Sequence, residues 1–400
     1  MKRVFIAVLL FLSATLSIYA QNYTSSGQEV NVITTAVPFL IIAPDARSGG
    51  MGEAGVASEP DANSMHWNPA KYAFMDKKFG FALSYSPWLR KLVNDINLAY
   101  LTGYWKIDER QAVAASLLYF SLGDITFTDE YGIEKGTYNP NEFSIDATYS
   151  RKFSEVISGA VAARFIYSNL TQGQFVQGAE TSPGTSVAAD VAVFYKKPVD
   201  LGTMDGEVTW GINLSNIGTK ISYSKTATEK DFIPTNFRAG AGFKVNFDDY
   251  NSLTTMIDFN KLQVPTPPIY AIDDSTGQQI VDDEGNPVIA DGMDPNVSVV
   301  QGMIQSWYDA PGGFSEEMRE WAIAFGLEYW YAKQFSVRTG FFYEDATKGN
   351  RKFFTVGAGL RYSVFGLDLS YLIPMEQQHP LENTLRFTLF FNFDPTAKKE

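Results

Sequence analysis

The feature that most constrains the fold is an alternating pattern that recurs from Phe79 onward. Segments of about ten residues carry apolar side chains at every second position and small or polar ones between them. In 321–331 the apolar set is aromatic at both ends, and the intervening residues are alanine, glycine, glutamate and tryptophan. Because successive side chains of a strand point to opposite sides, each segment has one face suited to lipid and one small or charged face.

Charged residues recur on the second face of these segments, where a soluble sandwich would place its core. Arg238 and Lys244 lie on it in 237–247, Asp190 in 187–195, and Arg386 in 385–393. An unpaired charge is costly in an apolar core, whereas a polar lumen tolerates it. The sequence therefore predicts an all-β transmembrane barrel.

The segments number about fourteen, an even count that brings both ends of the barrel to one side of the membrane. The lengths of the connections between consecutive segments support this count. Numbered along the chain, the even connections are short and most of the odd ones are long. Transmembrane barrels have this pattern, with short turns on one side of the membrane and long loops on the other. The predicted strands are 79–87, 94–105, 110–121, 142–153, 156–168, 185–197, 206–217, 235–247, 251–262, 320–331, 334–344, 352–362, 365–373 and 383–393.

The N-terminus has the order of a secretory signal peptide. Lys2 and Arg3 precede an apolar run, Val4–Leu12, and small residues lead to a cleavage site before Gln21. Removing residues 1–20 takes two positive charges from the formal net charge of −13, which leaves −15. A chain this acidic is not expected to bind nucleic acid. It contains no cysteine, so disulfides and cysteine-based metal sites are excluded.

The stretch from Gly50 to Gly55 has the G-x-G-x-x-G spacing of a dinucleotide-binding turn. Such a turn must open a helix with an apolar stripe, but Val56–Asn63 contains Pro60 and turn-forming residues instead. The chain has two histidines, His66 and His379, and no nucleophile motif accompanies either. We therefore expect no enzyme activity, no cofactor and no catalytic or metal site.

Residues 44–70, PDARSGGMGEAGVASEPDANSMHWNPA, resemble the N-terminal hatch of FadL-like outer-membrane proteins, in which a glycine-rich stretch runs into an Asn-Pro-Ala triplet. The opening Pro44–Ser48 and the stretch Asp61–Ser64 make the likeness greatest to the PorV family of the type IX secretion system of Bacteroidetes. The residues that carry the resemblance are Arg47, Gly50, Gly52, Glu53, Gly55, Asn68, Pro69 and Ala70.

The resemblance implies a FadL-like barrel in the outer membrane, with an N-terminal segment and luminal hatch over residues 21–78. The barrel would span 79–394, with a long extracellular loop at 263–319 and a periplasmic tail at 395–400. Both termini would be periplasmic. Glycines in the hatch allow the backbone to approach the wall closely. We expect Arg47, Glu53, Glu59 and Asp61 to pair with inward charges such as Arg164, Arg238, Lys244 and Arg361; the alternative is that these charges are hydrated.

The resemblance also implies a function that is not enzymatic. Members of the PorV family resemble shuttles that bind the C-terminal signal domain of secreted cargo at the translocon barrel SprA and pass it to a surface sortase complex (PorU, PorZ and PorQ-like proteins). One alternative is a FadL-like transporter of small hydrophobic molecules, and another is a PorQ-like paralogue. An enzyme acting on lipopolysaccharide acyl chains ranks last, because no nucleophile and base can be named.

The loops at 122–141, 169–184, 218–234, 263–319 and 374–382 are the expected binding face. The longest contains a run compatible with a helix, Val297–Tyr308. Tryptophan and tyrosine often anchor protein interfaces. The candidate contacts for partners or cargo are Tyr131, Phe175, Trp307, Tyr308 and Phe314.

Overall fold

The structure is a computed structural model that describes residues 30–394, apart from 91–92, 94, 129–130, 171–174, 177–178, 225–229, 274 and 377–379. The predicted signal peptide, the predicted tail 395–400 and His379 lie outside the described residues. None of the helices in this part of the chain has the length and apolarity needed to cross a membrane.

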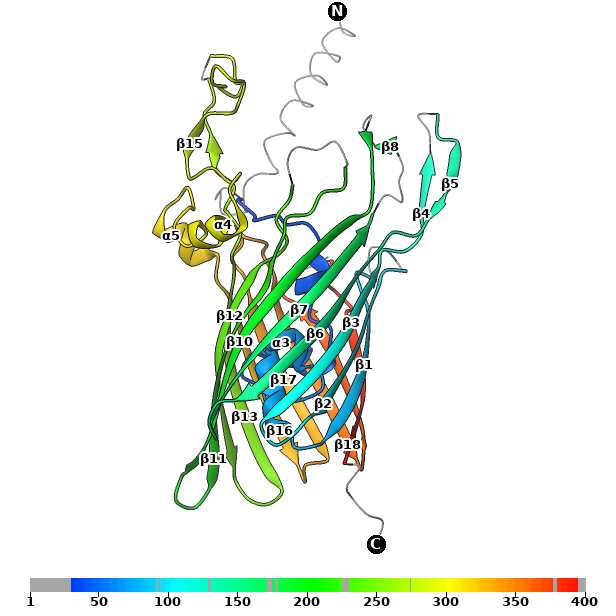
Figure 1. Ribbon diagram of the computed structural model, residues 1–400, viewed down its shortest axis with the longest axis vertical. Coiled ribbons are helices and arrows are strands. Elements are labelled where there is room, and N and C mark those ends of the chain that lie inside the picture. The colour runs from blue at the N-terminus through cyan, green and yellow to red at the C-terminus, as the bar shows by residue number, and fades with distance from the viewer. Residues whose placement is uncertain are drawn as a thin grey trace, which may run out of the picture.

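A closed barrel of fourteen antiparallel strands dominates the fold (Figure 1). Each strand pairs with its neighbours along the chain, and β1 closes the circle by pairing with β20 through partners such as Phe79 and Phe393. The strands are β1 Phe79–Pro87, β2 Asn97–Lys106, β3 Gln111–Ser121, β6 Asn141–Lys152, β7 Ile157–Asn169, β10 Gly184–Asp200, β11 Asp205–Gly218, β12 Asn236–Asn246, β13 Asn251–Leu262, β16 Ala322–Tyr331, β17 Phe335–Tyr343, β18 Lys352–Tyr362, β19 Phe365–Pro374 and β20 Leu385–Phe393.

The fourteen strands expected from the sequence are confirmed, and the alternation assigns their faces correctly. In β16 the residues with outward positions, such as Phe325, are half-exposed or exposed, whereas Glu328 between them is fully buried. The ladder shifts register once, between Ala189 and Val191 of β10, where it pairs with β11. Elsewhere in the barrel the described pairing runs without a break, so the wall is continuous.

The two ends of the barrel differ in their connections. At one end, the short-turn end, strands are joined by tight turns; at the other, the long-loop end, the loops carry structure of their own (Figure 1). Three small hairpins there were not predicted, and neither was the second helix of the longest loop. These elements are β4 Ile125–Thr128 with β5 Glu134–Tyr138, β8 Phe175–Val176 with β9 Ala179–Glu180, β14 Ile269–Tyr270 with β15 Ile289–Asp291, and the helices α4 Val299–Gln305 and α5 Phe314–Arg319.

Residues 37–75, here called the luminal segment, pass through the inside of the barrel (Figure 1). They form four short helices, η1 Pro38–Ile41, α2 Ala46–Gly49, α3 Ser64–Trp67 and η2 Pro69–Phe74. Their larger side chains, including Phe39, Met51, Trp67 and Tyr72, are buried at 1% exposure or less. The interior is therefore filled by chain and not by an open channel.

The first and last described residues lie at different ends of the barrel, whereas the termini themselves, which we expect on one side, lie outside the described residues. The backbone N–H of Asn31 donates to Thr347 and that of Ala36 to Phe232, and both acceptors belong to loops at the long-loop end. The last strand ends with Phe393 beside Phe79, at the short-turn end. The reason is that the luminal segment adds one more crossing to an even number of strands. The first described residues and the last therefore lie at opposite ends of the barrel.

Candidate functional site

The glycine-rich stretch contacts the barrel wall, and it follows a short helix instead of opening one. Asp45 caps α2 by accepting from the backbone N–H of Ser48 at 2.9 Å, and its other oxygen accepts from the indole N–H of Trp67 at 2.5 Å. The acid therefore fixes the turn from which the glycines depart.

The glycines are needed because backbone meets backbone at this point. Gly52 has a φ of +66°, and a Cβ at Gly340 of β17 would lie 2.1 Å from backbone atoms of Met51 and Gly52. A Cβ on Gly55 would lie 2.4 Å from the ring of Trp67. Glycine is the residue that permits both the positive φ and this approach. The wall contributes glycines of its own, such as Gly326 and Gly340, on the face that the alternation predicts to be small or charged.

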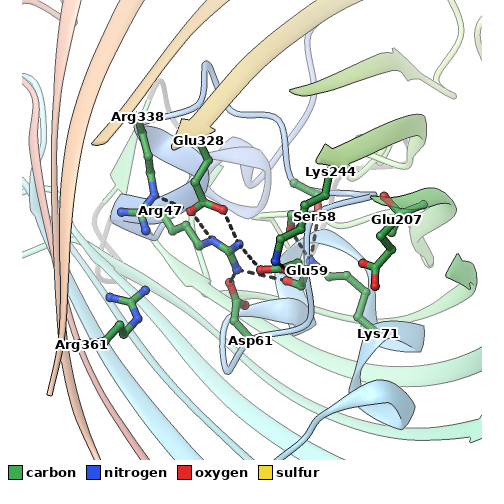
Figure 2. A network of polar contacts seen from close by, with 12 residues as sticks. Arg47, Ser58, Glu59, Asp61, Lys71, Glu207, Lys244, Glu328, Arg338 and Arg361 are labelled. Carbon is green, nitrogen blue, oxygen red and sulfur yellow. Dashed lines mark hydrogen bonds and ion pairs between the residues drawn. The ribbon is translucent and has the colours of Figure 1, made fainter. Parts of the chain in front are cut away.

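Arg47 is the centre of a polar network that ties the luminal segment to the wall (Figure 2). Its guanidinium donates to both carboxylate oxygens of Glu328 on β16, at 2.9 and 2.7 Å, and also to Asp61 at 3.1 Å. Glu328 is shared with Arg338 of β17, whose Nε lies 2.7 Å from it. Buried ion pairs of this kind are stable only when further hydrogen bonds compensate the loss of water, and this network supplies them.

One predicted ion pair is present and the others have different partners. Glu59 accepts from Lys244 at 2.5 Å, as expected, but Glu53 pairs with Arg386. Two of the other cations that were expected to contact the luminal segment form ion pairs within the wall instead. Arg164 pairs with Asp146 and Asp190, and Arg361 pairs with Asp368. Arg238 forms no ion pair among the described residues. Pairing across hundreds of residues depends on barrel register, which the sequence pattern does not specify.

The Asn-Pro-Ala triplet joins the segment to three strands. The side chain of Asn68 accepts from the backbone N–H of Ala70 at 3.0 Å and donates to the carbonyl oxygens of Val56 and Val193. The carbonyl of Ala70 accepts from Ser150 and Ser158, which lie on β6 and β7. Pro69 occupies the first position of η2, where its missing N–H costs nothing. The triplet thus caps a helix and anchors it to the wall.

Two titratable side chains of the segment serve packing. The ring of His66 contacts the rings of Trp67 and Tyr100 edge to face. Sequence reasoning missed Lys71, whose ammonium donates to the carbonyl of Gly55 and the hydroxyl of Ser58 at 2.9 and 2.8 Å. No three potential ligand residues in the described ranges converge as a metal site.

The predicted partner contacts lie at the long-loop end but do not form one cluster. Tyr131, 81% exposed, lies in the β4–β5 hairpin, and Phe175 begins β8, where its side chain is outside the described part. Trp307 contacts Phe237 and Trp321 edge to face, with ring centroids 5.7 and 5.9 Å away. Tyr308 and Phe314 are exposed close by in sequence. Trp307, Tyr308 and Phe314 belong to one loop, whereas Tyr131 and Phe175 belong to two others.

That loop has polar contacts inside and apolar side chains outside. Lys261 donates to Glu317 and Glu320, and Lys348 donates to Glu316 at 2.5 Å and to Glu320 at 3.0 Å, all buried. The outer side, here called the α4–α5 face, exposes apolar side chains. They are Val300, Ile304, Trp307, Tyr308, Phe314 and Met318. The sequence analysis had named Trp307, Tyr308 and Phe314 among these six. Val300 and Ile304 were missed, although their i, i+4 spacing places them on the same side of a helix.

A family model described as type IX secretion system protein PorV matches residues 25–269, more than half of the chain. No curated protein matches. Similar solved structures include the toluene transporter TbuX of Ralstonia pickettii (11% identity, 87% of this chain and 98% of that one, TM-score 0.43). They also include the toluene transporter TodX of Pseudomonas putida (9%, 88% and 98%, 0.47) and a FadL homologue of Pseudomonas aeruginosa (11%, 91% and 100%, 0.42). Because the family model covers more than half of the chain, the chain belongs to the PorV family of type IX secretion system proteins.

Proposed function

We propose that this outer-membrane protein is a non-enzymatic shuttle of the type IX secretion system. Its long-loop end faces the cell exterior, receives the C-terminal signal domain of secreted cargo at the translocon, and delivers it to the surface attachment complex. Family membership over residues 25–269 carries the assignment to secretion. The α4–α5 face carries the assignment of a protein contact, because it exposes six large apolar side chains within one loop and large exposed apolar areas mark interaction sites.

The position of the α4–α5 face favours the translocon barrel as its occupant. Phe237 and Lys261 are paired residues on the outward side of β12 and β13, and the loop covers both of them. The loop therefore lies against the outer side of these strands at the long-loop end (Figure 1), where a neighbouring barrel in the same membrane would meet it. Cargo would then bind the remaining loops, including the β4–β5 hairpin with Tyr131.

Transport of small hydrophobic molecules is the less favoured function for this chain. It needs an open lumen and a lateral gap, whereas residues 37–75 fill the lumen and the wall has a continuous ladder. The single register shift, at Ala189 and Val191, leaves pairing on both sides of it. These observations support a closed barrel that works through its surface.

Ile304→Ser combined with Phe314→Ser tests the proposal. A matched control is Ile272→Ser combined with Val281→Ser, which alters two exposed apolar residues in the same loop but outside the α4–α5 face. Tagged protein is purified from outer membrane, and recovery of a very large barrel protein and of cargo on the cell surface are measured. We expect the first variant to lose both and the control to keep both. Normal recovery with the first variant would refute the α4–α5 assignment, and normal secretion in a deletion strain would refute the function.

A further inference from the structure

Residues 30–36, here called the strap, connect the longest loop to the inside of the barrel (Figure 1). They contain no helix or strand, and the luminal segment begins directly after them at Val37. The strap is attached near both of its ends, to α5 and its surroundings by Asn31 and to another loop by Ala36. It therefore connects two parts of the molecule that are otherwise separate, the α4–α5 loop and the luminal segment.

The first attachment is made by Asn31. Its side-chain amide donates to the carbonyl oxygen of Pro267 at 3.1 Å and to a carboxylate oxygen of Glu316 at 3.0 Å. Its backbone N–H donates to the carbonyl of Thr347 at 3.0 Å. Glu316 belongs to α5 and also accepts from Lys348. Asn31 therefore keeps its side-chain partners only while α5 stays in its place.

The second attachment lies where the chain enters the barrel. The backbone N–H of Ala36 donates to the carbonyl of Phe232 at 2.9 Å. Phe39, in η1, is fully buried and stacks on Phe120 of β3, with the ring centroids 6.3 Å apart. Only residues 32–36 separate Asn31 from Val37, so little chain is available to absorb a movement of Asn31.

Val37 is held in a strained conformation between the strap and η1. Its φ of +48° and ψ of +49° lie in the left-handed region, which β-branched residues rarely adopt, and Pro38 after it favours an extended backbone instead. Such a conformation persists only while the surrounding contacts impose it. Release of the strap therefore lets Val37 return to an extended conformation, which changes the direction in which the chain enters η1.

Between its two attachments the strap is loosely packed. Val32 is 37% exposed and Thr34 is exposed. Two hollows of about 680 and 540 Å³ lie along it, the first lined by Val30 and Asn31 and the second by residues 34–38. Segments with few buried contacts open at a lower free-energy cost than the core around them. The strap can therefore detach while the barrel stays folded.

We propose that the strap couples the longest loop to the luminal segment. A protein that binds the loop and displaces α5 frees Asn31, Val37 then relaxes, and η1 loosens from Phe120. Occupation of the long-loop end is thereby transmitted to the inside of the barrel. This coupling goes beyond the proposed function, because it operates whichever protein displaces α5.

Asn31→Ala tests the coupling from the loop side, since it removes both side-chain hydrogen bonds of the strap and leaves the wall unchanged. Hydrogen exchange is measured by mass spectrometry on the purified full-length protein in detergent, and heat-modified migration on gels checks that the barrel is folded. We expect exchange to accelerate by at least about tenfold in both α5 and residues 39–42, because a hydrogen bond to a charged group contributes this much. Asn286→Ala, which removes an exposed amide from the same loop, should accelerate neither.

Phe39→Ala tests the coupling from the luminal side. Coupling between two sites is reciprocal, so loosening η1 should accelerate exchange in α5 by at least about fivefold. In the Asn31→Ala background the same substitution should cause no further acceleration in α5, since the strap is already detached. Met65→Ala is the control, because it removes a buried side chain from α3 and should leave exchange in α5 unchanged.

A purely local role for the strap predicts a different result. If Asn31→Ala leaves exchange in residues 39–42 unchanged, or Phe39→Ala leaves exchange in α5 unchanged, the strap fastens the loop without transmitting its movement, and the proposal is overturned. Neither result bears on the assignment to secretion, because no partner protein takes part in the measurement.

Discussion

Arg47 of the luminal segment and Glu328 of β16 form a two-pronged ion pair, with N–O distances of 2.9 and 2.7 Å and both side chains shielded from water. They are 281 residues apart in the sequence. The pair fixes α2 against the wall, and Arg338 on the far side of Glu328 completes the charge balance. Retention of the luminal segment therefore depends on a polar contact and on close backbone packing.

Arg47→Met should loosen the luminal segment. Removing one partner of a buried pair costs about 3–5 kcal/mol, at the lower end here because Glu328 keeps Arg338. We expect protease cleavage within residues 44–60 in isolated membranes, with the barrel still folded by heat-modified migration. Arg110→Met is the control, since its ion pair with Glu155 is 3.9 Å long and exposed. Unchanged protection in Arg47→Met would show that the pair does not hold the segment.

Gly340→Ala should displace the same segment by a different route. The added Cβ would overlap the backbone of Met51 and Gly52, and overpacking typically costs about 1–3 kcal/mol. The matched control is Gly103→Ala, where the nearest atom to the new Cβ is 3.5 Å away, an ordinary contact. Protease accessibility is again the readout. If both variants behave like the parent protein, close glycine packing is not required.

Lys261→Met should release the α4–α5 loop. The substitution leaves the buried carboxylates of Glu317 and Glu320 without one of their cations, a loss of about 3–5 kcal/mol. The chain has no cysteine, so a spin label at Ile304→Cys reports on this loop alone. We expect its mobility to rise in Lys261→Met. In Lys352→Met, the control, the lysine lies only over the ring of Tyr343, and mobility should stay the same.

Docking of the longest loop should strengthen as the pH falls. Asp309 is 1% exposed and accepts from the backbone N–H of Thr266. Burial, followed by the charges of Glu317 and Glu320, raises its pKa from 3.8 to about 6. Because the pKa is higher in the docked loop than in a detached one, the ionised acid opposes docking at pH 7. This penalty disappears as the pH falls through 6 and levels off near 4.

Hydrogen exchange of residues 299–319 measures this effect. Between pH 7 and pH 4.5, after correction for intrinsic rates, exchange should slow by about tenfold or more, since one pKa unit corresponds to a factor of ten. Asp309→Asn should give the slow rate at pH 7 and abolish the dependence. A parent protein whose corrected rate is constant over this range would contradict the assignment to Asp309.

The sequence by itself determined the strands and their faces. Period-two alternation is a local property, so residues such as Phe325 and Glu328 could be assigned to the lipid and luminal sides without knowing their neighbours. The glycine stretch and the Asn-Pro-Ala triplet likewise indicated where the backbone would approach the wall. Lys244 as the partner of Glu59 was predictable because both charges had to be luminal.

Only the tertiary structure decided which luminal groups meet. Closing the barrel sets the register of every strand at once. This places Glu328 beside Arg47 and Arg386 beside Glu53, and it leaves Arg238 without an ion pair in the described chain. The direction of the luminal segment, from the long-loop end to the short-turn end, also depends on loop contacts such as that between Asn31 and Thr347. These outcomes depend on contacts between residues far apart in the sequence, and alternation along a single strand carries no information about them.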